Sequence, residues 1–298
     1  MCTWETVTTA KDTCSRISEF VAYHLRLGAK RVTVFLDDPS QEISDDLSVR
    51  PGVNLVRCDD DFWLETVGAR PTAIALRQSK NATHAYHHAV SDWICHIDID
   101  EFIAPVDRTT TVSSALGQVP LSMQTARLSP VEYLSRPDGS DTGLYKLPFD
   151  AVQQKSDVVQ RAYPRFGTSL PSGFLSHLAG KVFVRTGDEY LKLAIHVAKY
   201  GDVKLPAYDV KGLFLAHRHA VSLDDFMKKF PTRMSTKSYS SSNPKRRTVE
   251  RALQDRGHLR DARLITHLYT EMCTARPELV KILSSTETLV EIELNLSA

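Results

Sequence analysis

Short apolar runs alternate with amphipathic stretches along the first hundred residues. The predicted strands are residues 6–9, 31–39, 53–57 and 93–97. Residues 17–25 keep the apolar spacing of a helix up to Gly28, and residues 72–90 predict a second helix. Strands that alternate with helices in this way indicate an α/β sheet of the nucleotide-binding type.

The pattern becomes mixed after Pro105. It predicts a short helix at 112–116, a loop-rich segment at 135–176, helical structure from Leu223 onward apart from a break at 238–247, and strands at 124–128, 181–185 and 212–216. We therefore expect one α/β domain over residues 1–227 and a helical C-terminal extension over residues 228–298.

The octapeptide HIDIDEFI, His96 to Ile103, places two carboxylates directly after an apolar strand. Ligands commonly bind at such a strand end in α/β proteins. In an extended chain, Asp98 and Asp100 point the same way, so their oxygens converge. Two hard oxygen ligands suit Mg²⁺ or Mn²⁺ when substrate phosphates complete the coordination. This pattern favours a nucleotide-diphosphate substrate.

The run RVTVFLDDP ends in a second pair of carboxylates, Asp37 and Asp38. An Asp-rich strand end is also an ordinary feature of turns, and Asp38 precedes Pro39. Because two predicted strands both end in acids, we expect the acids to lie at one edge of the sheet.

Composition indicates a globular protein. The 298 residues, 42% hydrophobic, are enough for one large core or two modest ones. The five cysteines are scattered and odd in number, which favours a reducing compartment. No stretch approaches the ~20 apolar residues of a membrane span, and the first residues lack the pattern of a signal peptide. We therefore expect a cytoplasmic location.

The net charge is +1, but charge is unevenly distributed. Residues 37–61 contain eight acids, whereas residues 228–263 contain eleven basic residues. A basic stretch is most often a solvated surface, and it also attracts anions such as a nucleotide diphosphate, a phosphorylated acceptor or an anionic membrane. Few aromatics are interleaved with it and no reader motif accompanies it, so nucleic acid is not an expected partner.

Three segments resemble family 2-type glycosyltransferases of GT-A fold, specifically bacterial members with an Asp-x-Asp-Glu-Phe signature. These segments are ISEFVAYHLRLGAKRVTVFLDDPS, RQSKNATHAYHHAVSDWICHIDIDEFI and GLFLAHRHAVSLDDFMKK. GFLSHLAGKVFVRTG is a fourth, weaker match. The similarity covers roughly residues 20–230. It implies a GT-A-like mixed sheet flanked by helices, with a C-terminal helical appendage.

A late histidine is the expected third metal ligand. His217 and His219 share one face of an extended segment, so spacing does not choose between them. The family resemblance favours His217, which lies five residues before Ser222. An imidazole beside two carboxylates would tilt the preference from Mg²⁺ towards Mn²⁺.

The resemblance also implies a donor site and inversion at the anomeric carbon. It places Asp37 at a position that contacts the nucleotide base, with Asp38 as the alternative. Lys11 follows the first strand and is a candidate near the nucleotide. Lys181 and Arg185 are candidates for phosphate or acceptor binding, although a basic strand edge explains them equally well.

Sugar transfer also needs a general base. Glu132 follows a predicted strand and is the preferred candidate, and the alternatives are Glu101, Asp188 and Glu189. Glu101 would face away from the two aspartates and could instead orient a loop.

The resulting hypothesis is a metal-dependent glycosyltransferase that moves a sugar from a nucleotide-diphosphate sugar to a hydroxyl of a glycan, lipid or other acceptor. The basic stretch 228–263 would supply a peripheral membrane contact. Two alternatives remain: a noncatalytic nucleotide- or glycan-binding module, and a nucleotidyl- or phosphotransferase with the same acidic edge.

Overall fold

The structure is a computed structural model that describes residues 2–136, 140–236 and 248–296. Contacts divide the chain into two compact units. The first unit contains Met1–Ser129, Ala179–Leu215 and Leu294–Ala298, and the second contains Pro130–Leu178 and Ala216–Glu293. Each unit consists of separate segments of the chain, whereas the sequence predicted a single boundary between residues 227 and 228. That domain boundary stays a prediction.

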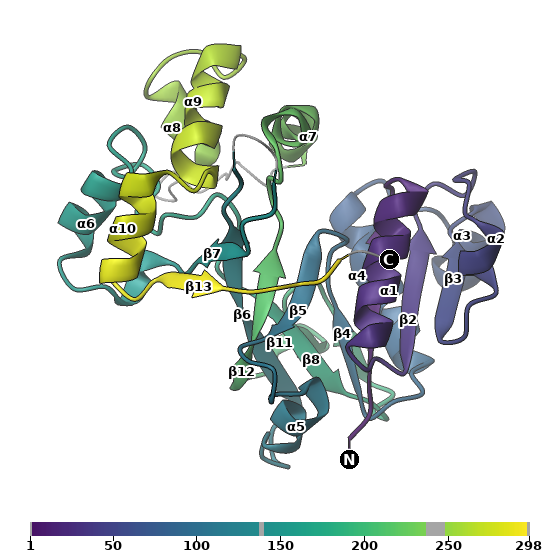
Figure 1. The fold of residues 1–298 in the computed structure, drawn as a ribbon. Helices are drawn as coiled ribbons and strands as arrows, with labels where there is room; N and C mark the ends of the chain where they lie inside the picture. Colours follow the sequence, from purple (N-terminus) through teal and green to yellow (C-terminus); the bar gives the residue numbers. More distant parts are fainter. Residues whose placement is uncertain (1, 137–139, 237–247, 297–298) are drawn as a thin grey trace. The chain divides into compact units, whose positions relative to one another are not determined.

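The first unit is a mixed sheet with helices on its faces (Figure 1). The strands of this sheet are β1 (Trp4–Ala10), β2 (Arg31–Leu36), β3 (Val53–Arg57), β4 (Trp93–His96), β5 (Glu101–Pro105) and β8 (Lys181–Arg185). A separate antiparallel sheet contains β9 (Leu191–Leu193), β10 (Ala198–Tyr200) and β11 (Val203–Lys204). Its helices are α1 (Cys14–Arg26), α2 (Asp45–Ser48), α3 (Asp60–Val67), α4 (Ile74–His87) and α5 (Val112–Gly117). The α/β class expected from the sequence is thus confirmed.

The strand order in this unit places β1 at the centre. Strands β4, β1, β2 and β3 are parallel neighbours, and β8 pairs antiparallel with β4. Helix α1 contacts β2 and β5, whereas α4 contacts β1 and β9, so the two helices cover opposite faces (Figure 1). Parallel strands buried on both faces explain the continuous apolar runs in the sequence.

Local signals account for the helix that follows β1. The hydroxyl of Thr13 accepts a hydrogen bond from the N–H of Arg16 and begins α1. Ile17, Phe20 and Val21 are fully buried along one face of the helix. Gly28 has a φ of +101° just after the helix, a conformation that glycine adopts without strain.

Two strands continue from the first unit into the second: β6 (Thr125–Tyr133) and β12 (Tyr208–His217). The second unit adds β7 (Leu144–Lys146), a 3₁₀ turn (Phe149–Ala151), α6 (Lys155–Ala162), α7 (Leu223–Ser235), α8 (Val249–Gln254), α9 (Ala262–Cys273), α10 (Pro277–Ser285) and β13 (Leu289–Glu291). Helix α10 packs on α6, and α9 packs on α7. These helices share one apolar core that includes Phe166, Phe226 and Leu268.

The segment 135–176, predicted as loop-rich, contains β7 and α6. Helix α6 begins after Gln154, whose φ is +49° and whose side chain makes no capping hydrogen bond. Its buried face consists of Val158, Val159 and Ala162. Most of the described residues of this segment lie outside helices and strands, so its loop-rich character is confirmed. Helix α6 was not predicted because frequent Pro, Gly and Ser residues around it hide its apolar spacing.

Candidate functional site

Acidic residues follow the carboxyl ends of the central parallel strands in the first unit. The chain runs from β1 outward to β2 and β3 and then returns to place β4 on the other side of β1. In α/β sheets, ligands bind outside the carboxyl ends of the strands where the strand order reverses. Asp37 and Asp98 follow β2 and β4, which flank β1, so both aspartates belong to this edge.

The HIDIDEFI motif forms a turn between β4 and β5. Strand β4 ends at His96, and the N–H of Glu101 donates to the carbonyl oxygen of Asp98 over 3.0 Å. Ile99 and Asp100 are therefore the central residues of a turn, so the alternation of faces expected for an extended chain does not apply. The carboxylate of Glu101 accepts the N–H of Asp98 at 2.8 Å and holds this turn. Glu101 thus faces Asp98, so the expectation that it faces away was wrong, while its carboxylate does orient the turn.

The carboxylate of Asp98 is held by side chains from two other elements. Lys181 of β8 donates from Nζ to Oδ2 of Asp98 at 2.8 Å and lies 3.3 Å from Oε2 of Glu101. Gln78 of α4 donates from Nε2 to Oδ1 of Asp98 at 2.9 Å. Burial would raise the pKa of Asp98, but the charge and hydrogen bond of Lys181, together with His96, hold this pKa below its usual range.

The carboxylates of Asp98 and Glu101 suit a hard divalent cation. Their oxygens lie within 4.8 Å of one another, and Asp98 keeps 29% of its side chain exposed, whereas Glu101 is fully buried. Asp100 is half-buried in the same turn, and its charge acts on Asp98. Carboxylate oxygens are the ligands that Mg²⁺ and Mn²⁺ prefer. The residues therefore fit a cation, with Lys181 as a fixed positive charge among them.

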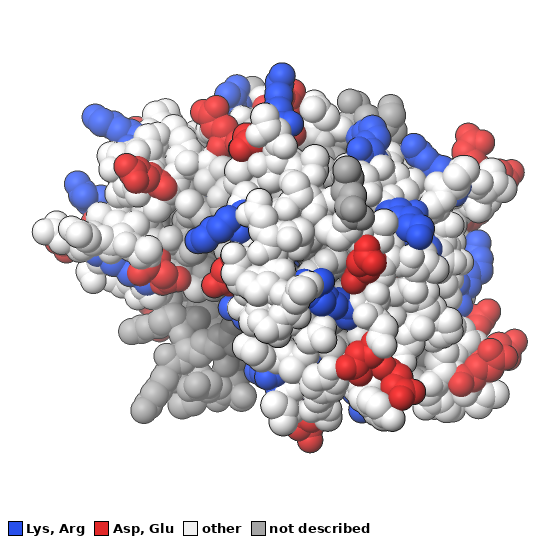
Figure 2. Space-filling view, turned by 90° about the horizontal axis from the view of Figure 1, so that it is seen from below, with Lys and Arg blue, Asp and Glu red and all other residues white. Residues whose placement is uncertain are grey.

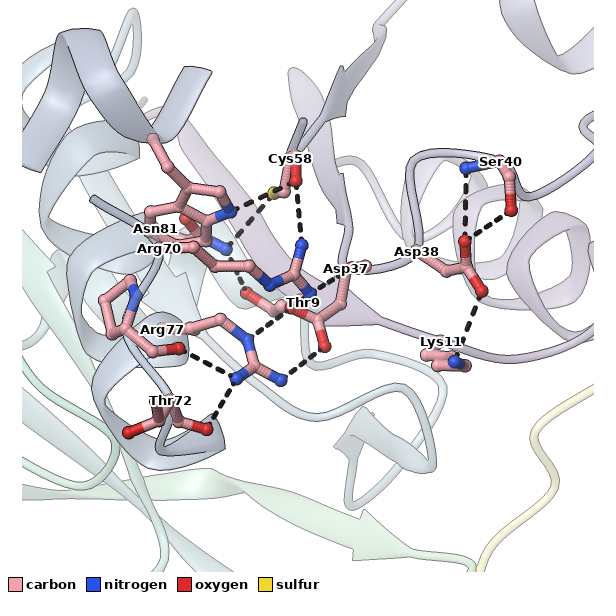
Figure 3. Close-up of polar contacts among 12 residues, drawn as sticks. Thr9, Lys11, Asp37, Asp38, Ser40, Cys58, Arg70, Thr72, Arg77 and Asn81 are labelled. Carbon is pink, nitrogen blue, oxygen red and sulfur yellow. Dashed lines mark hydrogen bonds and ion pairs between the residues drawn. The ribbon is translucent and has the colours of Figure 1, made fainter. Parts of the chain in front are cut away.

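Asp37 is bound by two arginines (Figure 3). Arg77 of α4 donates from Nε to Oδ1 at 2.6 Å and from Nη2 to Oδ2 at 2.7 Å. Arg70 donates to the carbonyl oxygen of Asp37 at 2.6 Å and lies 3.3 Å from its Oδ1. This bidentate arrangement makes Asp37 an anchor for α4, and contact with a nucleotide base stays a prediction.

A buried thiol adjoins this cluster. Asn81 donates to the thiol sulfur of Cys58 at 3.6 Å and to the hydroxyl of Thr9 at 3.0 Å (Figure 3). Burial raises the pKa of Cys58 to about 12. The thiol is therefore protonated at neutral pH, which does not suit a nucleophile.

Asp38 points away from the arginine cluster and contacts Lys11, which follows β1 (Figure 3). Lys11 Nζ lies 3.2 Å from Oδ2 of Asp38, and the hydroxyl of Ser40 donates to Oδ1 at 2.6 Å. The Ser40 hydroxyl, together with Lys11, holds the pKa of Asp38 below its usual range. The side chain of Lys11 is 70% exposed, so its ammonium is open to an anion.

Arg185 lies at the other end of β4. In the antiparallel pairing of β4 and β8, it stands opposite Trp93, the first residue of β4. Its guanidinium stacks on the Trp93 ring at 4.2 Å and donates to the carbonyl oxygens of Val119 and Met123. This location is at the opposite sheet edge from Asp98, and the contacts are those of a structural residue.

Glu132 occupies a closed network in the second unit. It pairs across strands with Lys146, whose Nζ lies 3.3 Å from Oε2. Its Oε1 accepts the N–H groups of Leu175 and Ser176 at 3.1 and 2.6 Å, and Lys146 also donates to the carbonyl oxygen of Met272. Both charged side chains are at most 3% exposed. The network fits an anchoring role for Glu132 better than proton transfer to an acceptor.

His217 and His219 also belong to the second unit, with ring centroids 5.1 Å apart. Arg233 donates to the Nε2 of His219 at 3.1 Å and to its carbonyl oxygen at 2.8 Å. A guanidinium bound to an imidazole nitrogen opposes metal binding there, so His217 is the better candidate of the two. His177, which the sequence analysis did not single out, lies 6.3 Å from His217 between ring centroids.

Sequence reasoning missed the roles of consecutive residues on α4. Arg77 binds Asp37 after β2, and Gln78 binds Asp98 after β4. Adjacent helical residues point about 100° apart, so one turn of α4 can reach two strand ends. The Arg-Gln pair was visible in the sequence, but only the fold shows its partners.

The basic stretch 228–263 falls partly outside the described residues, which exclude 237–247. Lys228 and Lys229 of α7 are paired with Asp224 and Asp225. On the face shown in Figure 2, basic and acidic side chains are interspersed. Within the described residues, no helix has the length and apolar character needed to cross a bilayer.

Comparison with known proteins identifies no family. No family model and no curated protein matches the chain. A solved structure described as a mycobacterial protein aligns at 15% identity with a TM-score of 0.30, over 62% of this chain and 53% of its own length. The chain thus spans about half the length of that structure. A likeness at this level carries no conclusion about fold or function.

Proposed function

We propose that the chain is a metal-dependent glycosyltransferase of GT-A-like fold, similar to family 2 enzymes, that transfers a sugar from a nucleotide-diphosphate sugar to an acceptor hydroxyl with inversion. The observation that carries the proposal is the position of Asp98, in a turn after β4 and beside the reversal of strand order at β1. This edge is where an α/β sheet binds nucleotides.

Asp98 and Asp100 are the proposed ligands of Mn²⁺ or Mg²⁺ from the first unit. His217 is the proposed third ligand, an assignment that rests on the family resemblance and on the engagement of His219 by Arg233. A divalent cation in such a site stabilises the negative charge that develops on a departing nucleotide diphosphate.

Lys11, Asp38 and Asp37 are the proposed donor contacts. The exposed ammonium of Lys11 suits a phosphate oxygen, and Asp38 beside it suits a ribose or base donor group. Asp37 contributes by holding Arg70 and Arg77 in place. Lys181 contacts Asp98 and is not proposed as a direct donor contact, and Arg185 is left out of the donor site because it lies at the opposite end of the strands.

The acceptor and the general base complete the proposal. A glycan, a lipid or another hydroxyl compound is the proposed acceptor class, and the basic stretch 228–263 would favour an anionic membrane surface nearby. Glu132 stays the sequence-based candidate for the base, although its contacts favour anchoring.

The proposal is tested by incubating the full chain with a panel of nucleotide sugars and hydroxyl acceptors in Mn²⁺, and by weighing the products. We expect an acceptor that gains the mass of a sugar, and no turnover in excess chelator. Asp100→Ala should lower turnover at least about a hundredfold because it removes a ligand of the cation. Asp202→Ala, at an exposed turn between β10 and β11, is the matched control and should leave turnover unchanged.

Two results would contradict the proposal. If Asp100→Ala keeps full turnover, the reaction does not depend on a cation that Asp100 holds. An acceptor that gains a phosphate or a nucleotide would instead indicate a phospho- or nucleotidyltransferase.

A further inference from the structure

Three contacts fix Asp98, and all of them lie within the first unit. Gln78 occupies one lone pair of Oδ1, Lys181 occupies one lone pair of Oδ2, and the backbone N–H is bound by Glu101. A carboxylate has about four lone-pair sites in all. One site on each oxygen therefore remains, and 29% of the Asp98 side chain is exposed.

We propose that Gln78 and Lys181 are positioning residues that act on cation binding in opposite directions: Gln78 strengthens it by orienting the Asp98 carboxylate, and Lys181 weakens it by placing a fixed positive charge beside the site. This inference rests on the proposed function, because it concerns the same cation site.

Gln78 is well suited to orient a ligand because its own position is fixed. The preceding residue, Arg77, makes two hydrogen bonds to Asp37 and two more to the carbonyl oxygens of Pro71 and Thr72. These contacts tie the beginning of α4 to the end of β2. The neutral amide of Gln78 then restrains Asp98 without adding charge. Groups that orient metal ligands in this way typically contribute about 10–100-fold to metal affinity.

Lys181 has a different effect because it places a positively charged side chain beside Asp98. Its side chain is fully buried, and its Nζ contacts both Asp98 and Glu101. The Nζ lies 2.8 Å from Oδ2 of Asp98 and 3.3 Å from Oε2 of Glu101, so the ammonium is paired with two carboxylates at the proposed site. A dication next to Asp98 is repelled by this charge, whereas a diphosphate is attracted. The site should therefore bind a cation weakly alone and more tightly with a nucleoside diphosphate.

The experiment measures Mn²⁺ binding to the full chain without any donor, from the electron paramagnetic resonance signal of free Mn²⁺. Gln78→Leu should raise the Kd for Mn²⁺ about 10–100-fold. Lys181→Met should lower this Kd about tenfold or more, because a repulsive unit charge close to the site is removed. Lys181→Arg keeps the charge and should stay close to the wild type.

Ser79→Ala is the matched control. Ser79 follows Gln78 on α4, and its hydroxyl donates to the carbonyl oxygen of Ala75, away from the strand ends. This variant should bind Mn²⁺ like the wild type. Circular dichroism and the melting temperature establish that each variant is folded, and Gln78→Leu tests the orienting role by itself if Lys181→Met does not fold.

The outcomes separate this inference from the proposed function. If Asp98→Asn abolishes Mn²⁺ binding while Gln78→Leu leaves it unchanged, the orienting role is overturned and the cation site stands. If Lys181→Met weakens Mn²⁺ binding, the charge effect is overturned and Lys181 only supports the fold. If the wild type binds no Mn²⁺ with or without a nucleoside diphosphate, both this inference and the proposed cation site are overturned.

Discussion

Lys181 in the first unit and Lys146 in the second unit are both fully buried beside a carboxylate, yet the two carboxylates differ in access to solvent. Glu132, the partner of Lys146, is 3% exposed, and its oxygens are bound by internal N–H groups. Asp98, the partner of Lys181, is 29% exposed. A buried lysine paired with a carboxylate thus makes an internal anchor in the second unit and adjoins a candidate cation ligand in the first, and the two cases differ in the exposure of the acid.

The largest expected effect is at the internal anchor. Glu132→Gln leaves Lys146 buried without its counter-charge, and breaking one partner of such a pair costs about 3–5 kcal/mol of stability. The free energy of unfolding in urea measures this loss. The double variant Glu132→Gln with Lys146→Met should recover part of it, because the unpaired charge is then gone. A Glu132→Gln variant of wild-type stability that loses turnover would instead favour the role of general base.

A smaller effect on stability is expected at His24. Its imidazole lies among aromatic rings, and burial keeps it neutral, whereas Glu132 and Lys146 form a buried ion pair. Burial lowers the pKa of His24 to about 3, while the hydrogen bond to the carbonyl oxygen of Phe20 opposes this shift. The unfolded chain, with a pKa near 6.5, binds a proton first as the pH falls. The stability from His24 is therefore present above pH 6.5 and is lost as the pH falls towards 3.

At pH 5 the loss amounts to about 2 kcal/mol relative to pH 7. Urea unfolding at both pH values measures it. His24→Gln should be less stable at pH 7 but should lack this part of the pH dependence. Equal pH slopes for the wild type and His24→Gln would contradict the assignment.

The smallest effect on stability is expected for the exposed pair of Lys11 and Asp38. Lys11→Ala should leave the free energy of unfolding unchanged, because exposed ion pairs contribute little. The same variant should weaken the binding of a nucleoside diphosphate in Mn²⁺, which calorimetric titration measures. A loss of stability without a loss of binding would place Lys11 in the fold and outside the donor site.

The sequence predicted the parallel strands well and the short peripheral elements poorly. Strands β2 and β3 begin at the predicted residues 31 and 53. The apolar β-branched run of β2 is typical of a buried parallel strand, whereas β3 at the end of the strand order is only partly buried. Helix α6 and strand β13 were missed because each is short and is stabilised by the second unit's core or by pairing with β7. Local propensity carries little information about such elements.

The sequence predicted only those parts of the candidate site that lie close together along the chain. The acids at the ends of β2 and β4 follow from the pattern of the chain. The turn at Asp98 does not, because it depends on the Glu101 carboxylate reaching back to an N–H group. The partners of Asp37 and Asp98 lie 40, 20 and 83 residues away along the chain, so only the fold reveals Arg77, Gln78 and Lys181 as their neighbours.

The central claim is that a divalent cation and a nucleoside diphosphate bind together at the carboxyl end of β4. Anomalous diffraction at the manganese edge, from crystals of the full chain soaked with Mn²⁺ and a nucleoside diphosphate, tests it most directly. The account predicts a manganese peak at coordination distance from an Asp98 oxygen, with diphosphate oxygens completing the coordination. A diphosphate bound elsewhere, or manganese without contact to Asp98 or Asp100, would contradict the account.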